Sequence, residues 1–116
     1  MDERIEKWLY DIKTAISEIN SFLKEINSGS FKEYQVNLLL KRAIEREFEI
    51  IGEAIHRILK QDHTFISIIP EAKSIIGLRN QIIHSYDNIS DENIWSILIN
   101  HLPKLKQQID DLLTTE

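Results

Sequence analysis

The chain of 116 residues contains 14 Lys and Arg, 19 Asp and Glu and no Cys, and its formal net charge is −5. A chain of this length is expected to form a single domain, 1–116, that buries about two-thirds of its unfolded surface. The composition excludes a disulfide framework and a thiolate metal site. The negative charge argues against a sequence-independent nucleic-acid-binding protein, although a local basic cleft can still bind RNA.

The first seven residues, MDERIEK, are too highly charged to form the apolar region of a signal peptide. No apolar run in the sequence approaches the ~20 residues that a membrane-spanning helix needs. We therefore expect a cytoplasmic protein that does not associate with a membrane.

Apolar residues recur at helical spacing, and Gly and Pro are scarce, with three and two residues. This pattern predicts an all-α fold with helices over residues 3–27, 33–61, 70–85 and 91–113. Because the connections are short, an up-down helical bundle of about four helices is expected. Pro103 lies inside the last helix and predicts a kink or local break there.

The first and last helices carry regular apolar seams. In the first helix the seam residues are separated alternately by four and three positions: Ile5, Leu9, Ile12, Ile16, Ile19, Leu23 and Ile26. The last helix shows the same alternation: Trp95, Leu98, Leu102, Leu105, Ile109 and Leu112. Such seams form the core of a bundle, or a dimer face.

The second helix has an acidic residue within its apolar face. At about 100° per residue, Glu47 falls near the middle of that face, among Leu40, Ala43, Ile44, Ile51, Ala54, Ile55 and Ile58. A buried carboxylate needs a partner. Glu45, Glu49 and Glu53 lie away from this face and are interpreted as solvated or interface positions.

The stretch 77–86, GLRNQIIHSY, holds three side chains suited to polar chemistry. The guanidinium of Arg79 is a permanent cation that can grip a phosphate. The imidazole of His84 titrates near neutral pH and can move protons. The hydroxyl of Tyr86 can accept a transferred group or serve as a hydrogen-bonding partner. Each residue alone has a simpler explanation: a structural ion pair, a helix-end histidine and an anchoring aromatic.

The spacing Arg-x4-His-x-Tyr resembles the signature of the HepT-like branch of the HEPN superfamily. Two other segments strengthen the resemblance. Residues 43–54 resemble the second-helix pattern of the family, an Arg followed by an Ile-Gly-Glu-Ala run. Trp95, followed by the Leu-Pro-Lys-Leu run of 102–105, resembles its last helix.

The resemblance implies an all-helical homodimer that acts as a metal-independent ribonuclease toxin. It also implies a partner, an MntA-like nucleotidyltransferase antitoxin that transfers AMP to the motif tyrosine, here Tyr86. Arg79 and His84 would be the catalytic residues. No cofactor is expected, and His56, His63 and His101 show no spacing typical of metal ligands.

Helical geometry constrains how the signature can work. Arg79 and His84 are about 140° apart on a straight helix, whereas Tyr86 is about 20° from Arg79. A two-fold dimer can bring two copies of the motif together. Arg79 lies within the apolar arc of its helix, so we expect it to contact Glu47, or each of the two to have another ionic partner. Asn80 can orient His84 or contact a phosphate.

Two other functions remain open. The chain can be a non-catalytic helical partner, or substrate-binding subunit, of a small nucleotidyltransferase, and the acidic charge favours this alternative slightly. An RNA-binding protein without cleavage activity is less favoured, because the sequence shows no basic surface interleaved with aromatic residues.

Overall fold

The computed structural model describes residues 1–25, 29–84 and 89–115, and the description below is confined to them. They form seven helices: α1 (Glu3–Glu25), α2 (Phe31–Val36), α3 (Leu38–Gln61), α4 (Phe65–Ile68), α5 (Ala72–His84), α6 (Asp91–Asn100) and α7 (Leu102–Thr114). No strand occurs among these residues. The predicted all-α fold is confirmed.

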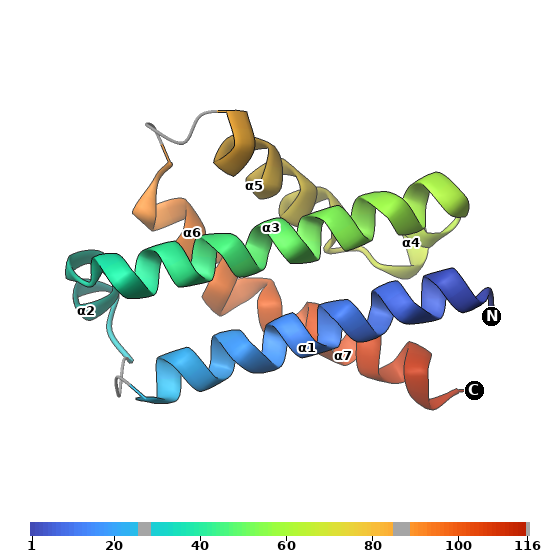
Figure 1. Cartoon of the computed structure of the whole chain (residues 1–116), viewed down its shortest axis with the longest axis horizontal. Helices are drawn as coiled ribbons and strands as arrows, with labels where there is room; N and C mark the ends of the chain where they lie inside the picture. Colours follow the sequence, from blue (N-terminus) through green and yellow to red (C-terminus); the bar gives the residue numbers. More distant parts are fainter. Residues whose placement is uncertain (26–28, 85–88, 116) are drawn as a thin grey trace.

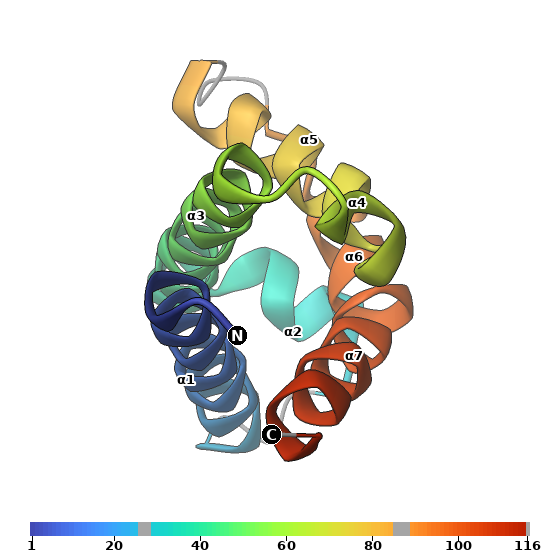
Figure 2. The ribbon, with the colours of Figure 1, turned by 90° about the vertical axis from the view of Figure 1, so that its right-hand side faces the viewer.

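Four arms run alternately in opposite directions: α1, α3, α5, and α6 followed by α7 (Figure 1). Viewed along the bundle, α1 and α3 form one side, and α6 and α7 form the other (Figure 2). Helices α4 and α5 join these sides along one edge, and α2 lies across the far end. The up-down arrangement of four arms agrees with the prediction, but two of the arms are divided.

The predicted seams form one continuous core. Its fully buried side chains include Leu9, Ile12 and Ile19 of α1, Ile51, Ile55 and Ile58 of α3, Ile75 of α5, and Leu105 and Ile109 of α7. Leu23 and Leu112, at the ends of the seams, are only partly buried. Ile26 lies outside the described residues. The alternating spacing therefore predicted the core correctly along the described part of both helices.

The predicted helix 33–61 is interrupted at Asn37, which ends α2 and caps α3. The Asn37 backbone N–H donates to the carbonyl of Tyr34 over 3.2 Å, and its side-chain oxygen accepts from the N–H of Leu40 over 3.0 Å. Asparagine is a preferred N-cap because its side chain satisfies a free N–H at the start of a helix. The apolar spacing continues across this position, so it conceals the break.

The last arm is divided at His101, two residues before Pro103. Pro103 lies in the first turn of α7, where a missing backbone N–H removes no hydrogen bond from the helix. The predicted break is confirmed. It lies just before Pro103 because a helix accepts proline in its first turn. Pro70 was expected to open the third helix, but that helix begins two residues later, at Ala72.

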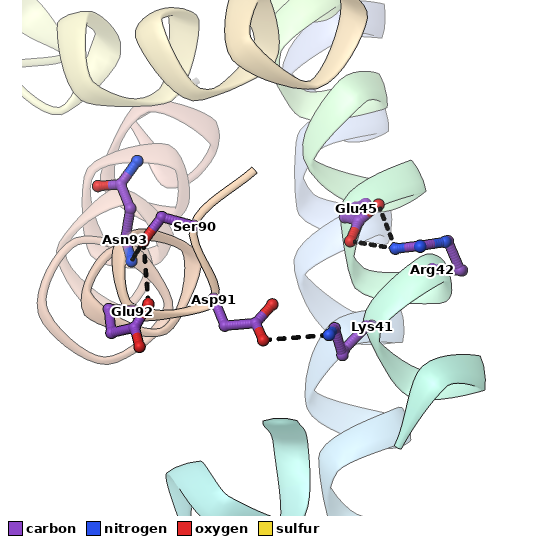
Figure 3. A network of polar contacts seen from close by, with 7 residues as sticks. All are labelled: Lys41, Arg42, Glu45, Ser90, Asp91, Glu92 and Asn93. Atoms are coloured by element: carbon purple, nitrogen blue, oxygen red, sulfur yellow. Dashed lines mark hydrogen bonds and ion pairs between the residues drawn. The ribbon is translucent and has the colours of Figure 1, made fainter. Parts of the chain in front are cut away.

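Helix α6 is fixed at its start by polar contacts and along its length by aromatic rings. Ser90 caps α6 by accepting from the N–H of Asn93 over 3.1 Å (Figure 3). Lys41 of α3 forms an ion pair with Asp91 over 3.0 Å (Figure 3). Tyr34, fully buried, packs against Trp95 with the ring centroids 5.5 Å apart and the ring planes tilted by 39°. These contacts hold α6 against α2 and α3.

Helices α3 and α5 approach closely at Gly52. A Cβ atom built at Gly52 would lie 2.4 Å from the Cβ and 2.8 Å from the Cγ of Arg79. Those atoms belong to the fixed root of the arginine, so they cannot move aside without moving α5. A residue without a side chain is therefore needed at position 52 for the two helices to pack at this distance.

We predict that Gly52→Ala destabilises the protein by about 1–3 kcal/mol, because the added methyl group forces α3 and α5 apart. Gly77 provides a matched control, since it is also helical and a Cβ built there meets no atom within 4 Å. Gly77→Ala should stabilise by about 0.5–1 kcal/mol through helix propensity. Urea unfolding of the three proteins measures both effects, and equal changes for the two variants would contradict the close approach.

Candidate functional site

Arg79 is held against α3 by a carboxylate that the sequence did not single out. Its Nη2 donates to Oε2 of Glu53 over 2.6 Å. Its Nη1 donates to the side-chain oxygen of Asn80 over 3.2 Å. The side chain is 21% exposed, and its Nε is buried without a partner in the described part of the chain. The stem of Arg79 is thus packed on Gly52, while its head lies at the surface.

Glu53 bridges two guanidinium groups. Its Oε1 accepts from Nε of Arg57 over 3.1 Å, while its Oε2 accepts from Arg79. Burial acts to raise the pKa of Glu53, but the hydrogen bond from Arg57 and the charges of both arginines outweigh it and lower the pKa. Glu53 is therefore ionised at neutral pH and provides a fixed negative charge for Arg79.

The guanidinium of Arg79 keeps free donors for a ligand. An arginine has five N–H donors, of which one is on the buried Nε and two are used by Glu53 and Asn80. One N–H therefore remains on each terminal nitrogen. Guanidinium N–H donors suit the oxygens of a phosphate.

His84 is the last residue of α5 and is exposed. No hydrogen bond or ion pair joins it to the described residues. Because it lies about 140° from Arg79 around the helix, the two side chains leave α5 on different sides. Tyr86, the predicted site of modification, lies outside the described residues.

Arg79 does not contact Glu47, and the alternative prediction, another ionic partner, is confirmed for Arg79, which pairs with Glu53. Glu53 is thus an ion-pair partner within the chain, not a merely solvated or interface position. Glu47 is buried, with 6% of its surface exposed, and one of its carboxylate oxygens has no partner in the described structure. Its close neighbour is another carboxylate, Glu18 of α1. Glu45 also differs from expectation, since it is buried and paired with Arg42 over 2.9 Å (Figure 3).

Asn80 contacts Arg79 rather than His84. The sequence left open whether Asn80 orients His84 or contacts a phosphate, and the observed bond to Nη1 of Arg79 gives it a third role. The sequence analysis also missed the roles of Gly52 and Glu53. One signal was available: a glycine inside a long helix usually has a packing reason, and Glu53 follows it directly.

The described residues contain no group of three or more His, Cys, Asp or Glu side chains that could hold a metal ion. Among the same residues, no helix is both long enough and apolar enough to cross a membrane.

The sequence matches the family model described as "Ribonuclease HepT-like" over residues 12–112. The chain is 32% identical to "Putative RNase MJ0127" of Methanocaldococcus jannaschii, over 94% of this chain and 87% of that protein. It is 30% identical to "Putative RNase TTE0752" of Caldanaerobacter subterraneus, over 87% and 89%. It is 29% identical to "Probable ribonuclease HepT" of Thermococcus cleftensis, over 90% and 92%. No solved structure shows significant similarity to the chain.

The buried carboxylate of Glu47 predicts how stability depends on pH. Burial, together with the Glu18 carboxylate beside it, raises the pKa of Glu47 from 4.5 to about 7. The folded state then binds a proton more tightly than the unfolded state, so the free energy of unfolding falls as the pH rises from about 4.5 to 7. Glu47→Gln should remove this fall, because the amide stays neutral.

Urea unfolding across this pH range tests the prediction. The parent and the Glu47→Gln variant should have similar stability below pH about 4.5, and the variant should be the more stable one above pH about 7. Glu25→Gln, an exposed carboxylate at the end of α1, should follow the parent at every pH. A Glu47→Gln curve parallel to that of the parent would show that Glu47 is ionised in the folded protein.

Proposed function

Because the chain belongs to the ribonuclease HepT-like family, we propose that it cuts RNA with Arg79 and His84 and acts as a toxin. The observation that supports this best is the contact between Arg79 and Glu53. Two helices, a glycine cradle and an ionised carboxylate hold one guanidinium at the surface with two N–H donors free. An exposed histidine lies five residues further along the same helix. A purely structural ion pair does not require that histidine.

The chemistry needs only these side chains and the RNA. Neutral His84 takes the proton from a ribose 2′-hydroxyl, and the 2′-oxygen attacks the adjacent phosphorus. As the bond from phosphorus to the 5′-oxygen breaks, a protonated imidazole donates a proton to that leaving oxygen. Arg79 stabilises the charge that develops on the phosphate. The products carry a 2′,3′-cyclic phosphate and a 5′-hydroxyl. The nucleophile belongs to the substrate, so no metal-bound water is required.

We further propose that the active form is a homodimer. Arg79 and His84 point away from each other around α5, so one copy does not present both groups to the same phosphate. A two-fold axis beside α5 would bring Arg79 of one protomer near His84 of its partner.

We predict that His84→Ala and Arg79→Ala each abolish RNA cleavage and growth toxicity, because each removes a group that acts on the scissile phosphate. His63→Ala and Arg46→Ala are matched controls, since both residues are exposed and lie outside α5. Cleavage should persist in EDTA, and circular dichroism should show that all variants are folded. A His84→Ala variant that cuts like the parent, or cleavage that stops in EDTA, would contradict the mechanism.

The same two variants test the dimer. When the two variants are mixed in equal amounts and exchange subunits, half of the dimers contain one subunit of each variant. In such a dimer, one of the two sites formed between the subunits has both Arg79 and His84. About a quarter of the parent activity should therefore return. If both residues act within one protomer, the mixture stays inactive.

We propose that an MntA-like nucleotidyltransferase antitoxin silences the toxin by transferring AMP to Tyr86. The family signature places a tyrosine two residues after the histidine, and Tyr86 stands at that position. An AMP group there would add a bulky anion close in sequence to His84. Its phosphate would compete with RNA for the free donors of Arg79.

Co-expression with such a nucleotidyltransferase should add one or more AMP units to the chain, as measured by intact mass. Tyr86→Phe should prevent the addition, because it lacks the acceptor oxygen. Tyr10→Phe, which removes the hydroxyl of an exposed tyrosine of α1, should not. The Tyr86→Phe protein should keep its toxicity in the presence of the antitoxin. An unmodified toxin that is fully inhibited in a tight complex would indicate occlusion instead of AMP transfer.

A further inference from the structure

A polar groove lies between α5 and α6, which are neighbours in the fold (Figure 2). It has a volume of about 220 Å³. We call it the α5–α6 groove and define it by the residues Lys73, Ser74, Gly77 and Gln81 of α5, Asn93 and Ser96 of α6, and His101 at its end. None of these side chains has a role in the function proposed above.

The groove stands out by its charge. None of its lining residues is a carboxylate, although the chain has 19 Asp and Glu and a net charge of −5. Four other hollows on the described surface each contain at least one carboxylate, including Glu33, Glu53 and Glu92. Lys73 is exposed and has no carboxylate partner in the described structure. One carboxylate, Glu71, lies at the end of the groove in contact with His101. Along the rest of the groove an anionic ligand would meet less repulsion than at those hollows.

The groove leads to His84. On α5, Gly77 and His84 are seven residues apart, which places them about 20° from each other around the helix and about 10 Å apart along it. Lys73 is about 40° from Gly77 on the same face. Arg79, about 160° from Gly77, points to the opposite side. A strand that enters beside Lys73 and follows α5 therefore arrives at the imidazole.

The walls of the groove are fixed by contacts between helices. Asn93 donates to the side-chain oxygen of Gln81 over 3.0 Å, which ties α6 to α5. At the other end, Nδ1 of His101 lies 2.5 Å from a carboxylate oxygen of Glu71. Gly77 leaves the floor open, because a Cβ built there meets no atom within 4 Å. The amide and hydroxyl groups that line the groove can bind the base and sugar of a nucleotide.

We propose that the α5–α6 groove binds single-stranded RNA next to the bond that is cut, with Lys73 contacting a backbone phosphate. This inference rests on the proposed ribonuclease function and adds to it the path of the substrate. The groove is smaller than the roughly 300–1,000 Å³ of a pocket for a drug-sized ligand, so it would contact only a short segment of the strand.

Binding can be measured without cleavage, by fluorescence anisotropy with a labelled 2′-O-methyl RNA that has no nucleophile. Lys73→Glu and Gly77→Glu should each weaken binding by about tenfold or more, because they place a negative charge in the groove. Lys32→Glu, the same charge change on the exposed face of α2, should leave the affinity nearly unchanged. Lys73→Ala should lower the slope of log K against log salt by about 0.7, the value for one phosphate on a single strand.

Cleavage of two substrates then separates this inference from the proposed function. On an RNA oligonucleotide, Lys73→Glu and Gly77→Glu should raise KM much more than on a dinucleotide, which is too short to reach Lys73 from the bond that is cut. Equal binding by the parent and both groove variants, or no binding by the parent, overturns the inference. If the parent cuts no RNA but binds it, and the groove variants lose that binding, RNA binding by the groove is supported and the proposed ribonuclease activity is rejected. Cleavage that depends on His84 but not on the groove would do the reverse.

Discussion

The close approach of α3 and α5 at Gly52 is the constraint on which the candidate site depends. It lets the stem of Arg79 pass across α3 at a distance that no other residue at position 52 allows. The guanidinium then meets Glu53, the next residue along α3, at 2.6 Å. One short segment of α3 thus sets both the packing of the helices and the position of the guanidinium for which we propose a phosphate-binding role. A substitution at Gly52 would therefore move Arg79, although position 52 itself is not proposed to contact a substrate.

The ion pair between Glu53 and Arg79 leaves part of the guanidinium free to bind another group. A single carboxylate shared between Arg57 and Arg79 satisfies each guanidinium only in part. With Asn80 taking one further donor, Arg79 is oriented but still able to bind an anion. Because the pKa of Glu53 is lowered, this arrangement persists across the neutral pH range.

The sequence predicted the features that depend on periodicity and missed those that depend on the third dimension. The seams of α1 and α7 follow from local rules, and the structure confirms them. The break at Asn37 was missed because apolar spacing continued through it. Whether Glu47 or another carboxylate pairs with Arg79 stayed open, because helical angles show which face a residue occupies but not which residue of another helix lies opposite. Glu47 instead faces Glu18, a pairing of like charges that spacing does not indicate.

The acidic net charge disfavours an RNA-cutting protein, but the positions of the carboxylates remove this objection. Several are neutralised locally: Glu45 by Arg42, Asp91 by Lys41, and Glu53 by two arginines. The α5–α6 groove, by contrast, has no carboxylate in its lining. Screening limits the reach of the remaining exposed charges to about 8–10 Å at physiological salt, so what a phosphate experiences near α5 is set by its nearest side chains. Net charge alone is therefore a poor guide to the ligand of so small a domain.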